Sequence, residues 1–132
     1  MTTRDFSAFS LDAFERGTID AAEFDHEAHI YVAWSYMNRY PVTAAIERFS
    51  GALKSLTRQL GVPEKYHETI TWFYLLLIAE RRGENEDWGA FRRHNNDLFD
   101  RSANVLTRYY RPATLQSDRA RQSFVLPDAV AA

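Results

Sequence analysis

Residues 70–79, with the sequence ITWFYLLLIA, constrain the fold of this chain most, because they are apolar on nearly every side of a helix. A helix that is apolar all round is covered by its neighbours instead of facing water on one side. Pro63 suits the first position of such a helix, and Gly83 suits its end. The pattern predicts a buried central helix at about residues 63–82, wrapped by other helices. The stretch is far shorter than the ~20 residues that cross a bilayer, so no membrane partner is expected.

Apolar residues recur with helical spacing in several other segments. Asp25 is a good N-cap for a helix that Pro41 ends, and Phe24 can pack onto its first turn. Further helices are expected at residues 10–16, 42–60, 88–94 and 102–110, the last capped by Ser102, with one more turn near Ser117. No segment alternates with period two, so we predict an all-α, single-domain helical bundle. Its parts are a lead-in at residues 1–24, a helical core at residues 25–110 and an irregular C-terminal strap at residues 111–132.

The composition excludes several classes of protein. A chain of 132 residues, 45% of them hydrophobic, is enough for one domain with its own core. The absence of cysteine excludes disulfides, thiolate metal sites and cysteine nucleophiles. The net charge is −2 without a basic stripe, so no nucleic-acid partner is expected. The chain begins without the apolar segment of a secretory signal, which favours the cytoplasm, and homo-oligomerisation stays open.

Three histidines fall on positions that face the core. His26 and His29 share the inward stripe of the first long helix, one turn apart, which is good chelate geometry. His67 lies in the first turn of the predicted central helix, on the same face as Ile70 and Tyr74. An up-down-up arrangement of three helices with short connections would bring both helix N-termini to one end of the bundle. The sequence therefore predicts that the three imidazoles converge.

Three imidazoles without sulfur match a three-histidine metal site with one open position, for which Zn, Fe, Cu and Ni are all suitable. We expect either one divalent transition metal per chain or none. Glu68 follows His67 directly and is the candidate catalytic group, as a general base, a ligand or a structural neighbour. On this hypothesis the chain is a small metal-dependent enzyme that acts on a small molecule, with hydrolase and oxygenase chemistry equally open.

Glutamates three residues before two of the histidines raise a second metal hypothesis. Glu23-x-x-His26 and Glu64-x-x-His67 form half of a carboxylate-bridged di-iron pattern. The available residues for its other half are Glu47 and Glu80. The match is incomplete, because Glu23 precedes the expected N-cap and Glu80 lies over three turns away from His67.

Two readings need no metal. The histidines can line a polar or acid–base pocket, or they can be structural groups bonded to backbone carbonyls. A non-catalytic helical module that binds a ligand or a partner is the alternative function. His94, in the polar stretch RRHNND, is expected at the surface.

Aromatic and hydroxyl side chains complete the expected pocket. A few convergent polar groups between aromatic walls are the ordinary form of a small-molecule site. The candidate pocket residues are Trp34, Tyr66, Thr69, Thr71 and Tyr74, with Trp72 as a further wall. Each aromatic side chain taken singly also fits core packing, and the Thr71 hydroxyl can bond back to the preceding turn.

Four motifs in the sequence resemble those of a known protein family. They are FDHEAHIYVAW at residues 24–34, KYHETIT at residues 65–71, RYYRPATL at residues 108–115 and ARQSFVLPD at residues 120–128. Together they resemble a family of small bacterial all-α proteins of unassigned function, with the pattern F-x-H-x-x-H-x-x-x-A-W, Y-H-E-T-x-T and A-R-x-x-F-V-x-P-D. The resemblance implies a shared signature that includes His26, His29, His67, Glu68, Thr69 and Thr71. Glu23 and Glu64 are outside that pattern, which weakens the di-iron hypothesis, and the family implies no activity.

The end of the chain and the core lead to two expectations about stability. Residues 124–126, Phe-Val-Leu, are too apolar as a group to stay in water, so we expect them to pack back on the domain or on a second copy. Leu53 and Leu76 are expected in the core, where truncation to alanine is severe. Truncation of His67 is expected to have a much smaller effect, on the hypothesis that its imidazole serves function.

Overall fold

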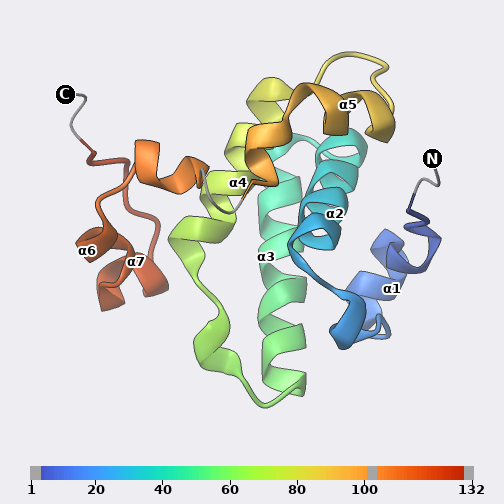
Figure 1. Ribbon diagram of the computed structural model, residues 1–132. Coiled ribbons are helices and arrows are strands. Elements are labelled where there is room, and N and C mark those ends of the chain that lie inside the picture. Colours follow the sequence, from blue (N-terminus) through green and yellow to red (C-terminus); the bar gives the residue numbers. More distant parts are fainter. Residues whose placement is uncertain (1–3, 101–103, 130–132) are drawn as a thin grey trace.

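The computed structural model describes residues 4–100 and 104–129, and these ranges contain helices and no strand (Figure 1). The prediction of an all-α bundle is confirmed. The α-helices are α1 Leu11–Arg16, α2 His26–Arg39, α3 Val42–Gln59, α4 Glu68–Arg81, α5 Trp88–His94, α6 Pro112–Leu115 and α7 Asp118–Gln122. Short 3₁₀ helices cover Ser7–Phe9, Ala21–Glu23, Pro63–Lys65, Asn96–Leu98 and Val105–Arg108.

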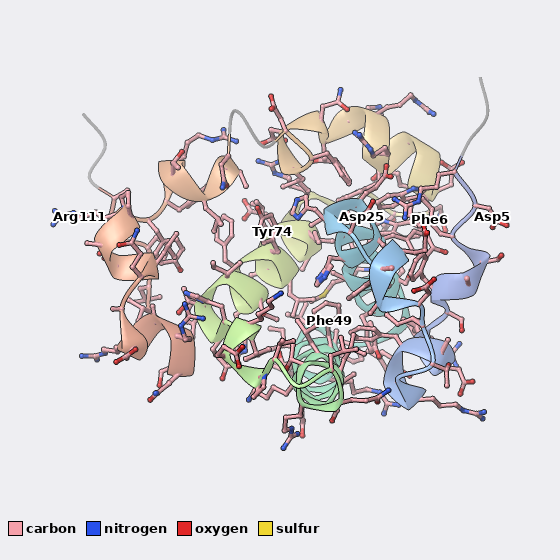
Figure 2. All side chains as sticks on the ribbon, turned by 60° about the horizontal axis from the view of Figure 1, so that its bottom comes forward. Asp5, Phe6, Asp25, Phe49, Tyr74 and Arg111 are labelled. Carbon is pink, nitrogen blue, oxygen red and sulfur yellow. The ribbon has the colours of Figure 1, made fainter. Side chains whose placement is uncertain are left out.

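Helices α2, α3 and α4 form the centre of the molecule, and each contacts the other two. In Figure 1, α2 and α4 run in one direction and α3 runs in the opposite one. Figure 2 looks nearly along α3, with the N-terminal segment beside α2 and the C-terminal segment beside α4. The up-down-up arrangement predicted from the short connections is therefore confirmed. It places the first turns of α2 and α4 at the same end of the bundle.

Side chains at four helix starts accept a hydrogen bond from a backbone N–H three residues ahead. This contact satisfies one of the amides that a helix start leaves unpaired. The four capping residues are Ser10, Asp25, Asp87 and Ser117, at the starts of α1, α2, α5 and α7. These starts agree with the positions expected from the sequence. The caps fix where each helix begins, and in α2 the start at Asp25 places His26 and His29 in the first turns of the helix.

The start of α4 differs from the prediction. Residues Pro63–Lys65 form a 3₁₀ turn, Tyr66 and His67 are extended, and the α-helix begins only at Glu68. His67 Nδ1 accepts the backbone N–H of Ile70 at 3.1 Å, so the imidazole itself caps the helix. The expectation that His67 lies within the first helical turn is therefore wrong. An unprotonated ring nitrogen accepts the orphan amide there, as a carboxylate or hydroxyl oxygen would.

The segment expected as a fifth long helix also differs. Val105–Arg108 is a 3₁₀ helix, and the Asn104 side chain accepts the backbone N–H of Leu106 at its start. The predicted cap, Ser102, lies outside the described residues. Helix α6 was not expected from the sequence, although Pro112 stands at its favoured first position.

The core lies where α2 and α4 face each other and α3. Its largest fully buried side chains include Phe14, Tyr36, Phe91, Leu75 and Ile78. Leu76, expected in the core, is 38% exposed instead. Because α4 is apolar on nearly all sides, periodicity alone did not show which face remains open. No helix in the described ranges is long and apolar enough to span a membrane.

Candidate functional site

A cavity of about 520 Å³ lies between α2, α3 and α4, and His26, His29 and His67 all belong to its walls. The predicted convergence of the three histidines on one site is therefore found. Phe49 and Tyr74, both labelled in Figure 2, come from α3 and α4 and line it as well. The other apolar lining residues include Phe24, Ile30, Ala33, Leu53, Leu56, Leu60, Val62, Ile70 and Leu75. The other polar ones are Thr57, Lys65, Tyr66 and Thr71.

His29 occupies the fourth position of α2. Its ring stacks on Phe24, with 3.9 Å between the ring centroids and 21° between the planes. This is the place of a hydrophobic staple, where the residue before the N-cap packs onto the first turn. Desolvation by burial, helped by the nearby His26, lowers the pKa of His29 to about 4, although Asp25 acts in the opposite direction. The ring is therefore neutral near pH 7.

No hydrogen bond joins the ring nitrogens of His29 to any of the described residues. A neutral imidazole carries one N–H donor and one lone pair. Both the donor and the lone pair are therefore available to a molecule that enters the cavity. The stack on Phe24 holds the ring in place without using either nitrogen.

His26 has one nitrogen engaged. Its Nε2 lies 2.7 Å from the carbonyl oxygen of Leu98, at the end of the 3₁₀ helix Asn96–Leu98. A carbonyl can only accept, so Nε2 carries the proton and Nδ1 of the neutral ring keeps a lone pair. The ring also meets Tyr74 edge-on, with 5.5 Å between centroids. The bond to Leu98 fixes the tautomer of His26 and joins α2 to the segment after α5.

His67 has both nitrogens engaged. Besides the cap at Nδ1, Nε2 donates to the carbonyl oxygen of Leu115 at 2.7 Å. The imidazole thus joins the first turn of α4 to α6, 48 residues further along the chain. Neither ring nitrogen is left for a ligand in this conformation. His67 borders the cavity with its ring, while its hydrogen bonds serve the fold.

The three imidazoles share a cavity without forming a metal-ligand cluster. Within residues 4–100 and 104–129, no group of three or more His, Cys, Asp or Glu side chains is placed to hold a metal ion. His67 would have to give up both hydrogen bonds to contribute a ligand. Glu23 and Glu64 of the di-iron hypothesis are exposed and do not line the cavity.

Glu68, the candidate catalytic residue, is not among the residues that line the histidine cavity. Its Oε1 accepts the Tyr66 hydroxyl at 2.5 Å and the Trp72 Nε1–H at 3.1 Å, and Lys54 Nζ lies 3.8 Å away. Burial and this carboxylate raise the pKa of Tyr66, so the phenol stays protonated and donates. Glu68 borders a neighbouring groove between α3 and α4 instead. The structure does not bring it together with His26 and His29.

Tyr66, Thr71 and Tyr74 line the cavity as expected, whereas Trp34 and Thr69 do not. Trp34 packs in an aromatic cluster against Trp88, with 5.5 Å between ring centroids. Its Nε1–H is buried without a partner among the described residues. The sequence did not single out Lys65 or the α3 leucines as lining residues, although the leucines belong to the apolar stripe of that helix.

Thr69 belongs to a set of contacts that we call the C-terminal clasp, formed by residues 109–129 against the first turns of α4. The buried Thr69 hydroxyl donates to the Ser123 carbonyl at 2.8 Å and accepts the Val125 N–H at 3.1 Å. Phe124 stacks on Trp72 with 5.4 Å between centroids. One threonine side chain thus pairs the backbone of two residues in the C-terminal strap.

Further hydrogen bonds join residues within the C-terminal clasp, and one joins the clasp to the turn before α4. Tyr110 donates its hydroxyl to the Val125 carbonyl at 2.6 Å. Asp128 accepts the Arg111 N–H at 3.0 Å and the Thr114 hydroxyl, and these bonds lower the pKa of its carboxyl. Further bonds link Arg121 to the Glu64 carbonyl at 2.6 Å and the amides of Asp128 and Ala129 to the Tyr109 carbonyl.

The expected docking of residues 124–126 is confirmed in part. Phe124 and Val125 are half-buried against the domain, but Leu126 is 73% exposed. Phe124 stacks on Trp72, and the backbone of Val125 is hydrogen-bonded to Thr69 and Tyr110, which fixes this part of the segment against the domain. His94 is exposed as predicted, and its Nδ1 lies 2.8 Å from Glu86 Oε2.

Comparison of the chain with protein-family models, curated proteins and solved structures found no match.

Proposed function

We propose that this chain binds a small, largely apolar molecule in the cavity between α2, α3 and α4. The observation that carries the proposal is the cavity itself, with apolar walls from three helices and a few polar groups among them. Its volume of about 520 Å³ falls within the range of about 300–1,000 Å³ that is ordinary for small-molecule sites. Such a molecule would be held by burial of its apolar surface and oriented by the polar groups.

The unpaired imidazole of His29 supports this proposal. His29 is half-buried, and its ring lines the cavity. The ring is held in place by its stack on Phe24 while both nitrogens stay unbonded among the described residues. A ligand in the cavity would supply the missing partner. The arrangement has no corresponding benefit for packing, because an apolar ring would fill the same space.

A metal ion held by His26 and His29 is the second candidate. These imidazoles are close enough for the charge of one to depress the pKa of the other, and the lone pair of His26 Nδ1 is unused. Elemental analysis of untagged protein tests this candidate directly. One equivalent of a transition metal, lost in the His29→Ala protein and retained in His67→Ala, would favour the metal over the apolar ligand.

The test of the proposed function uses a neutral apolar dye, N-phenylnaphthylamine, whose fluorescence rises in apolar surroundings. We expect about one dye per chain to bind the native protein, with an increase in Tm by mass action. Ala33→Leu adds bulk to a residue that lines the cavity and should weaken dye binding at least tenfold. Ala52→Leu adds the same bulk on α3 outside this lining and is the matched control.

Two results would contradict the proposal. One is a dye that leaves both the fluorescence and the Tm of the native protein unchanged. The other is equal weakening by Ala33→Leu and Ala52→Leu. Thermal melting of each variant shows whether it is folded, and the Tm increase of the native protein does not depend on either variant.

A further inference from the structure

We infer that the molecule bound in the histidine cavity carries a carboxylate group. This inference rests on the proposed function and adds the chemical class of the ligand. Lys65 is the one side chain with a full charge among the described residues that line the cavity, and Asp, Glu and Arg are missing from that set. A cavity whose fixed charge is positive favours an anionic head group over a cationic one.

Lys65 is free to serve a ligand. It stands at the end of the 3₁₀ helix Pro63–Lys65, is exposed, and forms no ion pair with the described residues. Lys54 shows the contrast, since its ammonium pairs with Glu68 at 3.8 Å and lies over the Tyr66 ring. The charge of Lys54 is therefore balanced within the protein, whereas the charge of Lys65 is not.

Hydrogen-bond donors in the wall add to this charge. His29 has an N–H in its neutral form, and Tyr74 has a hydroxyl that bonds to no described residue. Burial and the charge of Asp97 raise the pKa of Tyr74, so this hydroxyl remains a donor at neutral pH. Carboxylate oxygens accept only, and hydrogen bonds to an ionised acceptor are stronger than neutral ones.

The rest of the wall determines what the carboxylate is attached to. Leucines of α3 and Ile30 and Ile70 from the flanking helices leave most of the lining apolar. An alkyl or aromatic body would bury its surface against them, while the acid group stays within reach of Lys65 at the exposed edge. The ligand class is therefore a small apolar carboxylic acid.

Three probes with the same chain and different head groups test the inference: octanoate, octanol and octylamine. Isothermal titration calorimetry of the native protein at pH 7 should show octanoate binding at least tenfold more tightly than octanol, with octylamine weakest. Equal affinity for octanoate and octanol would overturn the inference and leave the proposed function standing. Dye binding without octanoate binding would overturn it as well. Failure of all three probes and of the neutral dye would refute the proposed function itself.

Matched variants separate the site from general surface charge. Lys65→Gln should weaken octanoate binding about two- to fivefold, as for a partly exposed ion pair, and leave octanol unchanged. Arg58→Gln removes an exposed positive charge of α3 outside the cavity wall and should change neither affinity. His29→Phe keeps the stack on Phe24 and should weaken octanoate while octanol binds as well or better. Equal losses in Lys65→Gln and Arg58→Gln would show that the carboxylate responds only to overall charge.

Discussion

The two sides of α4 use the same residue type in opposite ways. On the clasp side, His67 has both ring nitrogens hydrogen-bonded, one to Ile70 and one to Leu115. On the cavity side, His29 has neither nitrogen bonded within the described residues, and its pKa is lowered to about 4 by burial. Both residues stand near the start of a helix, and both border the same cavity. The comparison teaches that position relative to the core does not tell these two histidines apart, whereas the hydrogen-bond partners of their ring nitrogens do.

Some other polar groups of the two sides show the same contrast, although His26 and Tyr66 in the cavity wall are hydrogen-bonded within the protein. On the clasp side, Thr69, Tyr110 and Asp128 all have hydrogen-bond partners in the protein. On the cavity side, the Tyr74 hydroxyl and the Lys65 ammonium have none among the described residues. The clasp is therefore expected to determine stability, and the cavity is expected to determine binding.

Truncation of the C-terminal clasp after Gln122 should produce the largest effect. A chain that ends at Gln122 loses both partners of Thr69, the acceptor of Tyr110 and the ring stacked on Trp72. We expect a loss of about 4 kcal/mol or more in the free energy of unfolding, because buried polar groups are left unpaired and apolar surface is exposed. Urea denaturation measures it. Leu126→Ala, at an exposed position, is the control and should stay within about 0.5 kcal/mol. A truncated chain as stable as the native one would show that the clasp is dispensable.

Adjacent leucines of α4 provide the next largest contrast. Leu75 is fully buried and lines the cavity, whereas Leu76 is 38% exposed. Leu75→Ala should destabilise the protein by about 2–5 kcal/mol and Leu76→Ala by less than about 1 kcal/mol. Thermal and urea unfolding of the two variants measure this difference. Equal losses would mean that Leu76 is covered in solution, for instance by a second copy of the chain, which sedimentation would then detect.

Substitution of the two contrasting histidines tests the comparison directly. His67→Ala should cost about 2–3 kcal/mol, because the helix loses its cap and the Leu115 carbonyl loses its donor. This expectation replaces the smaller effect expected from the sequence. His29→Phe should change stability by less than about 1 kcal/mol, since the ring and its stack are kept. His67→Asn, which can still cap the helix, should fall between the two. If His29→Phe were as damaging as His67→Ala, His29 would be structural as well.

A pH titration should reveal the smallest of these effects. The pKa of His29 is about 4 in the folded protein and about 6.5 in the unfolded chain, so the unfolded state binds more protons between these values. Stability is therefore unaffected by this group above about pH 6.5 and falls as the pH decreases toward 4. We expect about 1–2 kcal/mol at most, because the ring borders an open cavity. The loss should be absent from His29→Phe when both proteins are unfolded in urea across this range. A loss of the same size in both would assign the acid sensitivity to another group.

Local signals in the sequence were sufficient for most of the helices. Caps such as Asp25 and Asp87 satisfy their own helix start within three residues, so their effect can be recognised without the fold. The convergence of the histidines also followed from local information, because short connections force neighbouring helices to be antiparallel. The location of the histidine cavity, at the end of the bundle where α2 and α4 begin, could therefore be predicted from the sequence.

The hydrogen-bond partners of the side chains around the cavity could not be predicted in the same way. His67 was expected inside a helix that begins at Pro63, because proline at a first helical position gives no sign of a second start at Glu68. The partners of His67 and Thr69 lie 48 to 56 residues away, and contacts of that length leave no periodic pattern. The partners of Glu68 are closer in sequence, since Tyr66 and Trp72 lie two and four residues away, but a lone glutamate beside a histidine does not show which of its neighbours it will bond.

The large sequence separation between Thr69 and its hydrogen-bond partners has a consequence for folding during translation. Its partner Val125 follows 56 residues later, so a ribosome adding about 5–20 residues per second completes this pair roughly 3–11 s after Thr69 itself. For most of that interval Trp72 lacks the ring of Phe124, and His67 lacks the Leu115 carbonyl to which it donates until that residue is added. Helices α2, α3 and most of α4 can meet while the remainder is still being translated. The start of α4 consequently acquires these partners only late in translation.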